Sequence, residues 1–127
     1  MDRVLKTPVF NRWMRKADLT DQALSKATDE MKNGLIDADL GGGILKKRVP
    51  LPGRGKRGAA RTLLATNRKG RWIFLFGFQK NDRENISGHE LEALQELSSD
   101  LMGFSEAEID LAVARHELLE VAYETKK

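Results

Sequence analysis

The first third of the chain has the apolar spacing of two short amphipathic helices. In residues 9–19, apolar side chains recur every three or four positions, so they share one face of a helix that begins beside Pro8. A second helix follows, with Thr20 or Asp21 as its N-cap and Gly34 as its end. The two apolar stripes are Phe10, Trp13, Met14 and Ala17, then Leu24, Ala27, Met31 and Leu35. The pattern predicts a helical hairpin with a very short connection.

The middle of the chain predicts three β-strands, at residues 44–51, 61–67 and 71–78. Residues 37–43 end in three consecutive glycines, which favour neither helix nor strand, so we expect a loop there. The second and third strands are separated by a three-residue turn ending at Gly70, which predicts an antiparallel hairpin. Because the third strand is apolar on both faces, we place it in the interior of the sheet.

Two capping boxes predict two helices in the last third of the chain. Ser87 and Glu90 form the first box, and Ser105 and Glu108 form the second. In each box the serine hydroxyl and the glutamate satisfy free backbone N–H groups at the helix start. Residues 118–121 are expected either to form a short strand or to pack as coil.

Length and composition indicate one small domain of the α/β (α+β) class. The chain has 127 residues, the usual size of one domain, so we expect residues 1–127 to fold together. It has no cysteine, which excludes disulfides and thiolate metal sites. The charged N-terminus has no signal-peptide pattern, and the apolar stretch at 72–78 is far shorter than the roughly 20 residues that span a bilayer. We expect a soluble cytoplasmic protein without membrane contact.

Charge is segregated along the chain. Residues 44–85 contain twelve Lys and Arg against two acids, a net charge of +10, whereas residues 1–43 are neutral. Residues 87–127 have a net charge of −7. A basic middle segment indicates a polyanionic partner such as nucleic acid.

The densest basic run, residues 46–61, combines cations with glycines. Arginine pairs with phosphate through two parallel hydrogen bonds, and glycine lets the backbone approach a phosphate closely. The plainer alternative is a flexible solvated loop. Residues 80–85 follow the third strand, and on an antiparallel sheet Lys80 and Arg83 would face the basic run across one groove. The alternative for this segment is a polar turn.

Other chemistries have little support in the sequence. The two histidines, His89 and His116, lie in expected helices and outside the basic segments, so neither suits a general acid or base there. No combination of His, Cys and acidic residues has metal-ligand spacing, and residues 53–58 lack the strand–turn–helix context of a dinucleotide site. We expect no metal and no cofactor.

Several motifs together resemble the RelE-like toxins, including the HigB type, of type II toxin–antitoxin systems. The resemblance extends over about residues 8–121. The segments are GLIDADLGGG (34–43), KRV (47–49), PGRGKRG (52–58), RT (61–62), FGFQKN (76–81) and NI (85–86). It implies a RelE-like fold, with an N-terminal helical hairpin packed on a twisted antiparallel sheet and helices at the C-terminus.

The resemblance also implies an mRNA interferase, a ribosome-dependent endoribonuclease that inhibits translation. In such enzymes the ribose 2′-hydroxyl attacks the neighbouring phosphate, a reaction that needs stabilisation of the phosphorane charge and two proton transfers. The expected catalytic residues are Arg61, Lys80, Lys56 and Arg54. The expected RNA-binding residues are Lys46, Lys47, Arg48, Arg57 and Arg83. The implied partners are a cognate antitoxin of the helix-turn-helix type, mRNA and the ribosome.

Two departures from the family pattern leave the proton-transfer residue unassigned. Ala59 stands where some relatives have a second glycine, and Tyr123, the single tyrosine, lies in an acidic tail. Three alternatives therefore stay open: a gyrase inhibitor like the related ParE toxins, an RNA-binding module without catalysis, and a toxin that retains only antitoxin binding.

Overall fold

The computed structural model describes residues 2–51 and 58–123. In chain order the elements are β1 (Arg3–Lys6), α1 (Pro8–Lys16), α2 (Asp21–Lys32), β2 (Ala38–Gly41), β3 (Ile44–Pro50), β4 (Ala59–Thr66), β5 (Arg71–Gln79), α3 (Gly88–Gly103), α4 (Glu106–Ala114) and β6 (Leu119–Glu120). This content confirms the α+β class. Among the described residues, no helix has the length and apolar character needed to cross a membrane.

The strands form one open sheet in the order β2-β3-β4-β5-β1-β6. Strands β2 to β5 pair antiparallel, β1 pairs in parallel with β5, and β6 pairs antiparallel with β1. The sheet is therefore mostly antiparallel. Strand β5 lies in the interior of the sheet, as its two apolar faces predict. Of the two structures expected for residues 118–121, a short strand or coil, the short strand β6 is found.

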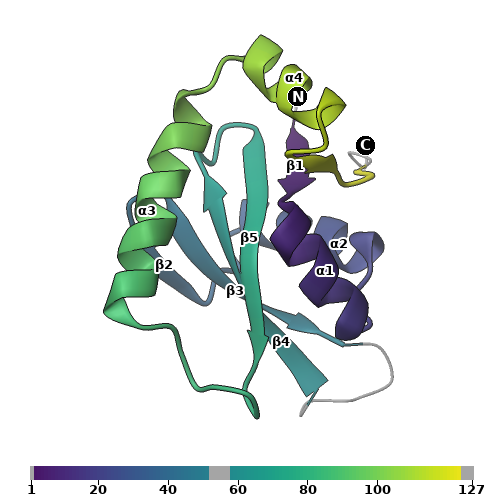
Figure 1. The fold of residues 1–127 in the computed structure, drawn as a ribbon. Coiled ribbons are helices and arrows are strands. Elements are labelled where there is room, and N and C mark those ends of the chain that lie inside the picture. Colours follow the sequence, from purple (N-terminus) through teal and green to yellow (C-terminus); the bar gives the residue numbers. More distant parts are fainter. Residues whose placement is uncertain (1, 52–57, 124–127) are drawn as a thin grey trace.

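Helices cover both faces of the sheet (Figure 1). On one face, α1 and α2 bury a core that includes Phe10, Leu24 and Phe74. On the other face, α3 and α4 bury a second core around Leu63 and Ile109. The predicted N-terminal helical hairpin thus packs on the sheet, and α3 lies along the opposite side of it.

Strand β1 was not predicted from the sequence. Its residues Val4 and Leu5 are both buried, and Leu5 pairs in register with Ile73 of β5. Four residues are too few to show a clear two-residue alternation. Its partner is also far away in the chain, so no turn residues mark the pairing.

The prediction that residues 37–43 form a loop is wrong for its first part, because β2 pairs there with β3. Gly42 and Gly43 form the turn that follows, and their lack of side chains lets α3 approach closely. A Cβ on Gly42 would lie 2.7 Å from Cγ of Gln95, and one on Gly43 would lie 2.6 Å from Oγ of Ser98. Both glycines also have positive φ, at 61° and 82°, a region that L-residues rarely adopt.

Side chains cap the helices as the sequence predicts. The hydroxyl of Thr20, and not the Asp21 carboxylate, accepts the hydrogen bond at the start of α2, from the N–H of Ala23 at 3.2 Å. Both capping boxes, at Ser87 and Ser105, are complete. Such caps satisfy backbone donors that a helix leaves without internal partners.

Arg71 joins the end of α3 to the start of α4. Its buried guanidinium donates to the carbonyl oxygens of Leu101 and Phe104, at 2.8 and 2.7 Å, and pairs with Glu106 at 2.7 Å. The hydrogen bond from Arg71 is the main reason why the pKa of Glu106 lies below its usual value. One side chain from β5 therefore holds both C-terminal helices against the sheet.

Candidate functional site

Three neighbouring strands place cations and aromatic rings in two rows on one face of the sheet. Arg48 of β3 is opposite Arg61 of β4, and Arg61 is opposite Phe78 of β5. Directly opposed residues of antiparallel strands project from the same face, so these three side chains form the first row. The second row, one step along the strands, contains Lys46, Leu63 and Phe76. We call these two rows the cationic surface.

The cationic surface lies on the α3 side of the sheet, where its apolar members join the core under α3 and its cations border that core. Leu63 and Phe78 belong to the core under α3, and Phe76 packs partly against it. Lys46 and Arg61 are half-buried, and Arg48 is exposed. The cations thus stand at the border between a hydrophobic core and solvent, where an extended ligand has access to them.

Arg61 has little to neutralise it in the described part of the chain. Its Nη1 donates to the carbonyl oxygen of Ala59 at 3.3 Å, and no ion pair to its guanidinium is found among the described residues. Arg68, by contrast, pairs with Asp39 at 2.9 Å, and Arg71 pairs with Glu106. A half-buried arginine without a carboxylate is suited to bind an external anion such as phosphate.

Lys47 does not join its sequence neighbours on this surface. Its amine projects from the opposite face, where it pairs with Glu30 at 3.0 Å and donates to the carbonyl oxygen of Leu35 at 2.9 Å. Its side chain is only 8% exposed. The structure therefore separates Lys47 from Lys46 and Arg48.

Lys80 follows β5 directly and is exposed. The residue before it, Gln79, pairs with Ala60, which is adjacent to Arg61 in β4. Lys80 therefore lies two positions along the chain from Phe78, the residue opposite Arg61. A shared site for Lys80 and Arg61 stays a prediction.

Arg83 lies over the aromatic end of both rows. Its Cζ is 5.8 Å from the ring centre of Phe76 and 5.9 Å from that of Phe78. Glu90, in the first turn of α3, accepts from Nη1 at 2.9 Å and from Nη2 at 2.5 Å. The Arg83 hydrogen bonds, followed by those from Ser87, lower the pKa of Glu90 to about 2.

Three predicted site residues, Arg54, Lys56 and Arg57, lie outside the described residues. The ends of their segment are described: the N–H of Leu51 donates to the carbonyl oxygen of Gly58 at 3.1 Å. Leu51 and Gly58 therefore lie at the end of the β3–β4 hairpin that carries Arg48 and Arg61.

The groups that usually transfer protons belong to the C-terminal helices and tail, and not to the two rows. His89 is exposed in the first turn of α3, and His116 is exposed after α4. The hydroxyl of Tyr123 donates to Asp29 of α2 at 2.5 Å, and burial is the main cause that raises its pKa. Among residues 2–51 and 58–123, no cluster of three or more His, Cys, Asp or Glu could hold a metal ion.

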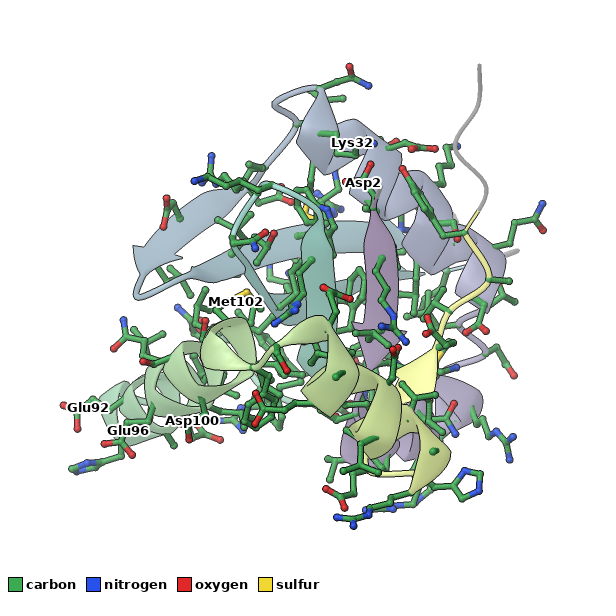
Figure 2. All side chains as sticks on the ribbon, turned by 90° about the horizontal axis from the view of Figure 1, so that it is seen from above. Asp2, Lys32, Glu92, Glu96, Asp100 and Met102 are labelled. Atoms are coloured by element: carbon green, nitrogen blue, oxygen red, sulfur yellow. The ribbon has the colours of Figure 1, made fainter. Side chains whose placement is uncertain are left out.

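Three acids of the C-terminal segment lie away from the cationic surface. In Figure 2, Glu92, Glu96 and Asp100 project from the side of α3 that faces away from the sheet. The pattern of charge along the sequence is therefore also a pattern in space, with an acidic outer face on α3 and basic rows on the sheet.

Sequence reasoning missed three contributors to the site. From the sequence, Phe76 and Phe78 belong only to the apolar third strand and to the FGFQKN motif, although their spacing of two along a strand indicates a common face. Glu90 was recognised only as a capping residue. Nothing local in the sequence indicates that its carboxylate also binds Arg83.

A family model of the RelE toxin of the RelE/RelB toxin–antitoxin system matches residues 2–121. The chain belongs to the RelE toxin family. No curated protein matched the chain. Membership in the RelE family makes this protein a toxin of a toxin–antitoxin system and implies an antitoxin as its partner.

Proposed function

We propose that this RelE-family toxin is a metal-independent endoribonuclease that cleaves mRNA on the ribosome and so inhibits translation. The observation that carries the proposal is the row of Arg48 and Arg61 beside an aromatic ring, with no carboxylate paired to Arg61 among the described residues. Single-stranded RNA offers phosphates to such cations.

In the proposed reaction, the ribose 2′-oxygen attacks the adjacent phosphorus and the bond to the 5′-oxygen of the next nucleotide breaks. The products are a 2′,3′-cyclic phosphate and a 5′-hydroxyl. The 2′-hydroxyl gives its proton to a base, and the leaving oxygen takes one from an acid. Arg61 stabilises the negative charge of the phosphorane, since a fixed cation at a half-buried position needs no reorganisation during the reaction.

The other cations of the site bind flanking phosphates or take part in proton transfer. Lys46 and Arg48 bind flanking phosphates, and Lys80 is the candidate for proton transfer among the described residues. Arg54 and Lys56 stay predicted members of the catalytic group, and Arg57 of the RNA-binding group. We leave Lys47 out, because its amine is bound to Glu30 on the other face of the sheet.

The proposal extends to the partners and the compartment. We expect the antitoxin to be a helix-turn-helix protein with an acidic segment that covers the cationic surface, because a segment of charge +10 attracts an acidic chain. Both proteins would act in the cytoplasm, where mRNA is translated.

The test compares Arg61→Gln with Arg68→Gln. Both variants lose one positive charge, but Arg68 lies at the opposite end of β4, in the turn, and pairs with Asp39. After controlled expression, mRNA 5′ ends are mapped and growth is measured. We expect new 5′ ends inside coding regions with the wild type and Arg68→Gln, and roughly 10²-fold slower cleavage with Arg61→Gln.

Two outcomes would overturn the proposal. If growth stops without new 5′ ends, the toxin acts on another target, and a gyrase assay with the purified protein is the next measurement. If Arg61→Gln cleaves as fast as Arg68→Gln, the cationic surface is not the site of cleavage.

A further inference from the structure

We propose that Arg83 is a stacking platform for an RNA base and not a ligand for phosphate. The inference rests on the proposed function, because it concerns how the same surface holds RNA. It departs from the expectation, based on sequence, that Arg83 is one more cation for the RNA backbone.

The hydrogen-bonding edge of Arg83 is already occupied within the protein. Its Nε donates to the carbonyl oxygen of Asn85 at 3.1 Å, and its two terminal nitrogens donate to the two carboxylate oxygens of Glu90. An arginine recognises phosphate through this same planar fork. A phosphate would therefore have to displace a carboxylate that neutralises the charge and binds in the preferred bidentate geometry.

The faces of the guanidinium have a different environment from its edge. The ring centres of Phe76 and Phe78 are 5.8 and 5.9 Å from Cζ and only 6.3 Å from each other, so the two rings lie in a similar direction from the guanidinium. The Arg83 side chain nevertheless stays 36% exposed. Since the donors are engaged in the plane and both rings lie in a similar direction, we infer that the guanidinium face turned away from the rings is open to a ligand.

A flat, fixed and exposed guanidinium is a surface on which bases stack well. Glu90 supplies the rigidity, because it is held at the start of α3 by the N–H of Ser87 at 2.8 Å. Phe78 is in register with Arg61. A base stacked on Arg83 would therefore belong to a nucleotide next to the phosphate that Arg61 binds.

Two substitutions separate stacking from phosphate binding. Arg83→Phe keeps a planar surface and removes the charge, whereas Arg83→Lys keeps the charge and removes the plane. The ligand is a short single-stranded RNA with 2′-O-methyl riboses, which cannot be cleaved by its own 2′-oxygen. Its affinity is measured by fluorescence anisotropy over a range of salt concentrations, and then with single abasic positions along the strand.

We expect Arg83→Lys to weaken binding about 10-fold and Arg83→Phe to bind nearly as well as the wild type. Neither Arg83→Lys nor Arg83→Phe should alter the salt dependence of RNA binding. Arg61→Gln, which removes a phosphate contact, should lower the slope of log K against log salt by about 0.7. One abasic position should weaken binding to the wild type but not further weaken binding to Arg83→Lys, because the two changes remove the same contact.

The opposite pattern of affinities would contradict the proposal that Arg83 stacks on a base. If Arg83→Lys binds normally while Arg83→Phe binds weakly with a reduced salt slope, Arg83 contacts phosphate, and the proposed nuclease function still stands. If the wild type binds no RNA even at low salt, the RNA-directed function itself fails. Circular-dichroism melting of each variant shows whether a change in binding comes from a loss of folding. Glu90→Gln is a second variant, which weakens the Arg83–Glu90 pair without changing Arg83 itself.

Discussion

Trp13 of α1 fills the space where a side chain at Gly77 of β5 would stand. A Cβ at position 77 would lie 2.2 Å from Cζ3 of Trp13, well inside any real contact. The Trp13 ring also packs against Phe10, with ring centres 5.4 Å apart. The absence of a side chain in β5 thus decides how closely α1 approaches the sheet.

Gly77→Ala should therefore destabilise the fold by about 1–3 kcal/mol, the usual effect of overpacking. Urea unfolding measures the free energy. Gly103→Ala is the matched control, since a Cβ there has no neighbour within 4 Å, and it should be neutral or slightly stabilising. Equal stability of the two variants would contradict the close contact. In a protein that already carries Trp13→Leu, Gly77→Ala should lower the free energy of unfolding much less than it does in the wild type.

The adjacent residues Lys46 and Lys47 should respond to the same substitution in opposite ways. Lys47→Met removes a buried amine from Glu30 and Leu35, so it should lower the free energy of unfolding by about 1–3 kcal/mol and leave RNA affinity unchanged. Lys46→Met should leave stability within about 0.5 kcal/mol of the wild type and reduce the salt slope of RNA binding by about 0.7. Urea unfolding and salt titration of both variants measure the two effects. A loss of RNA affinity in folded Lys47→Met would return that residue to the binding surface.

Arg71→Met should loosen the C-terminal helices. The substitution leaves the carbonyl oxygens of Leu101 and Phe104 without this donor and Glu106 without its buried partner, an expected loss of about 2–4 kcal/mol. Hydrogen exchange should become faster in α4 and the last turn of α3 before it changes in β4. Arg68→Met, which removes only an exposed pair with Asp39, should stay within about 1 kcal/mol of the wild type. If both variants exchange alike, Arg71 does not anchor these helices.

The Arg83–Glu90 pair predicts a defined dependence of stability on pH. The pKa of Glu90 is about 2 in the folded protein, against 4.5 for an unperturbed glutamate. A lowered pKa means that the ionised group stabilises the fold above pH 4.5, and that this contribution is lost as the pH falls towards 2. Glu90→Gln should thus be less stable than the wild type at pH 7, and the difference should vanish near pH 2. Urea unfolding at a series of pH values measures this.

Glu92→Gln is the control for that series, because Glu92 lies on the outward side of α3 (Figure 2) and should follow the wild type at every pH. A constant difference between Glu90→Gln and the wild type down to pH 2 would mean that the carboxylate does not stabilise the fold through its charge.

Much of the secondary structure was predictable from short stretches of sequence. The two N-terminal helices, both capping boxes and the β4–β5 hairpin were expected, because each depends on residues only a few positions apart. The hydrogen bond from the N–H of Glu90 to the hydroxyl of Ser87, at 3.1 Å, is of this kind. Strand β1 depends on contact with β5, some seventy residues later, and the sequence contains no local mark of that pairing.

The sequence alone determined the segregation of charge and the alternation that turns Lys46 and Lys47 to opposite sides of a strand. Which side meets solvent was decided by tertiary structure, because α2 covers the face of β3 that carries Lys47, whereas Lys46 on the other face stays partly exposed. The same holds for Arg83. Its charge is known from the sequence, but Glu90 and the two phenylalanine rings come together around it only when β5 and α3 pack. Helix caps and turns form between near neighbours, whereas the partner of a charged side chain depends on which distant elements burial brings together.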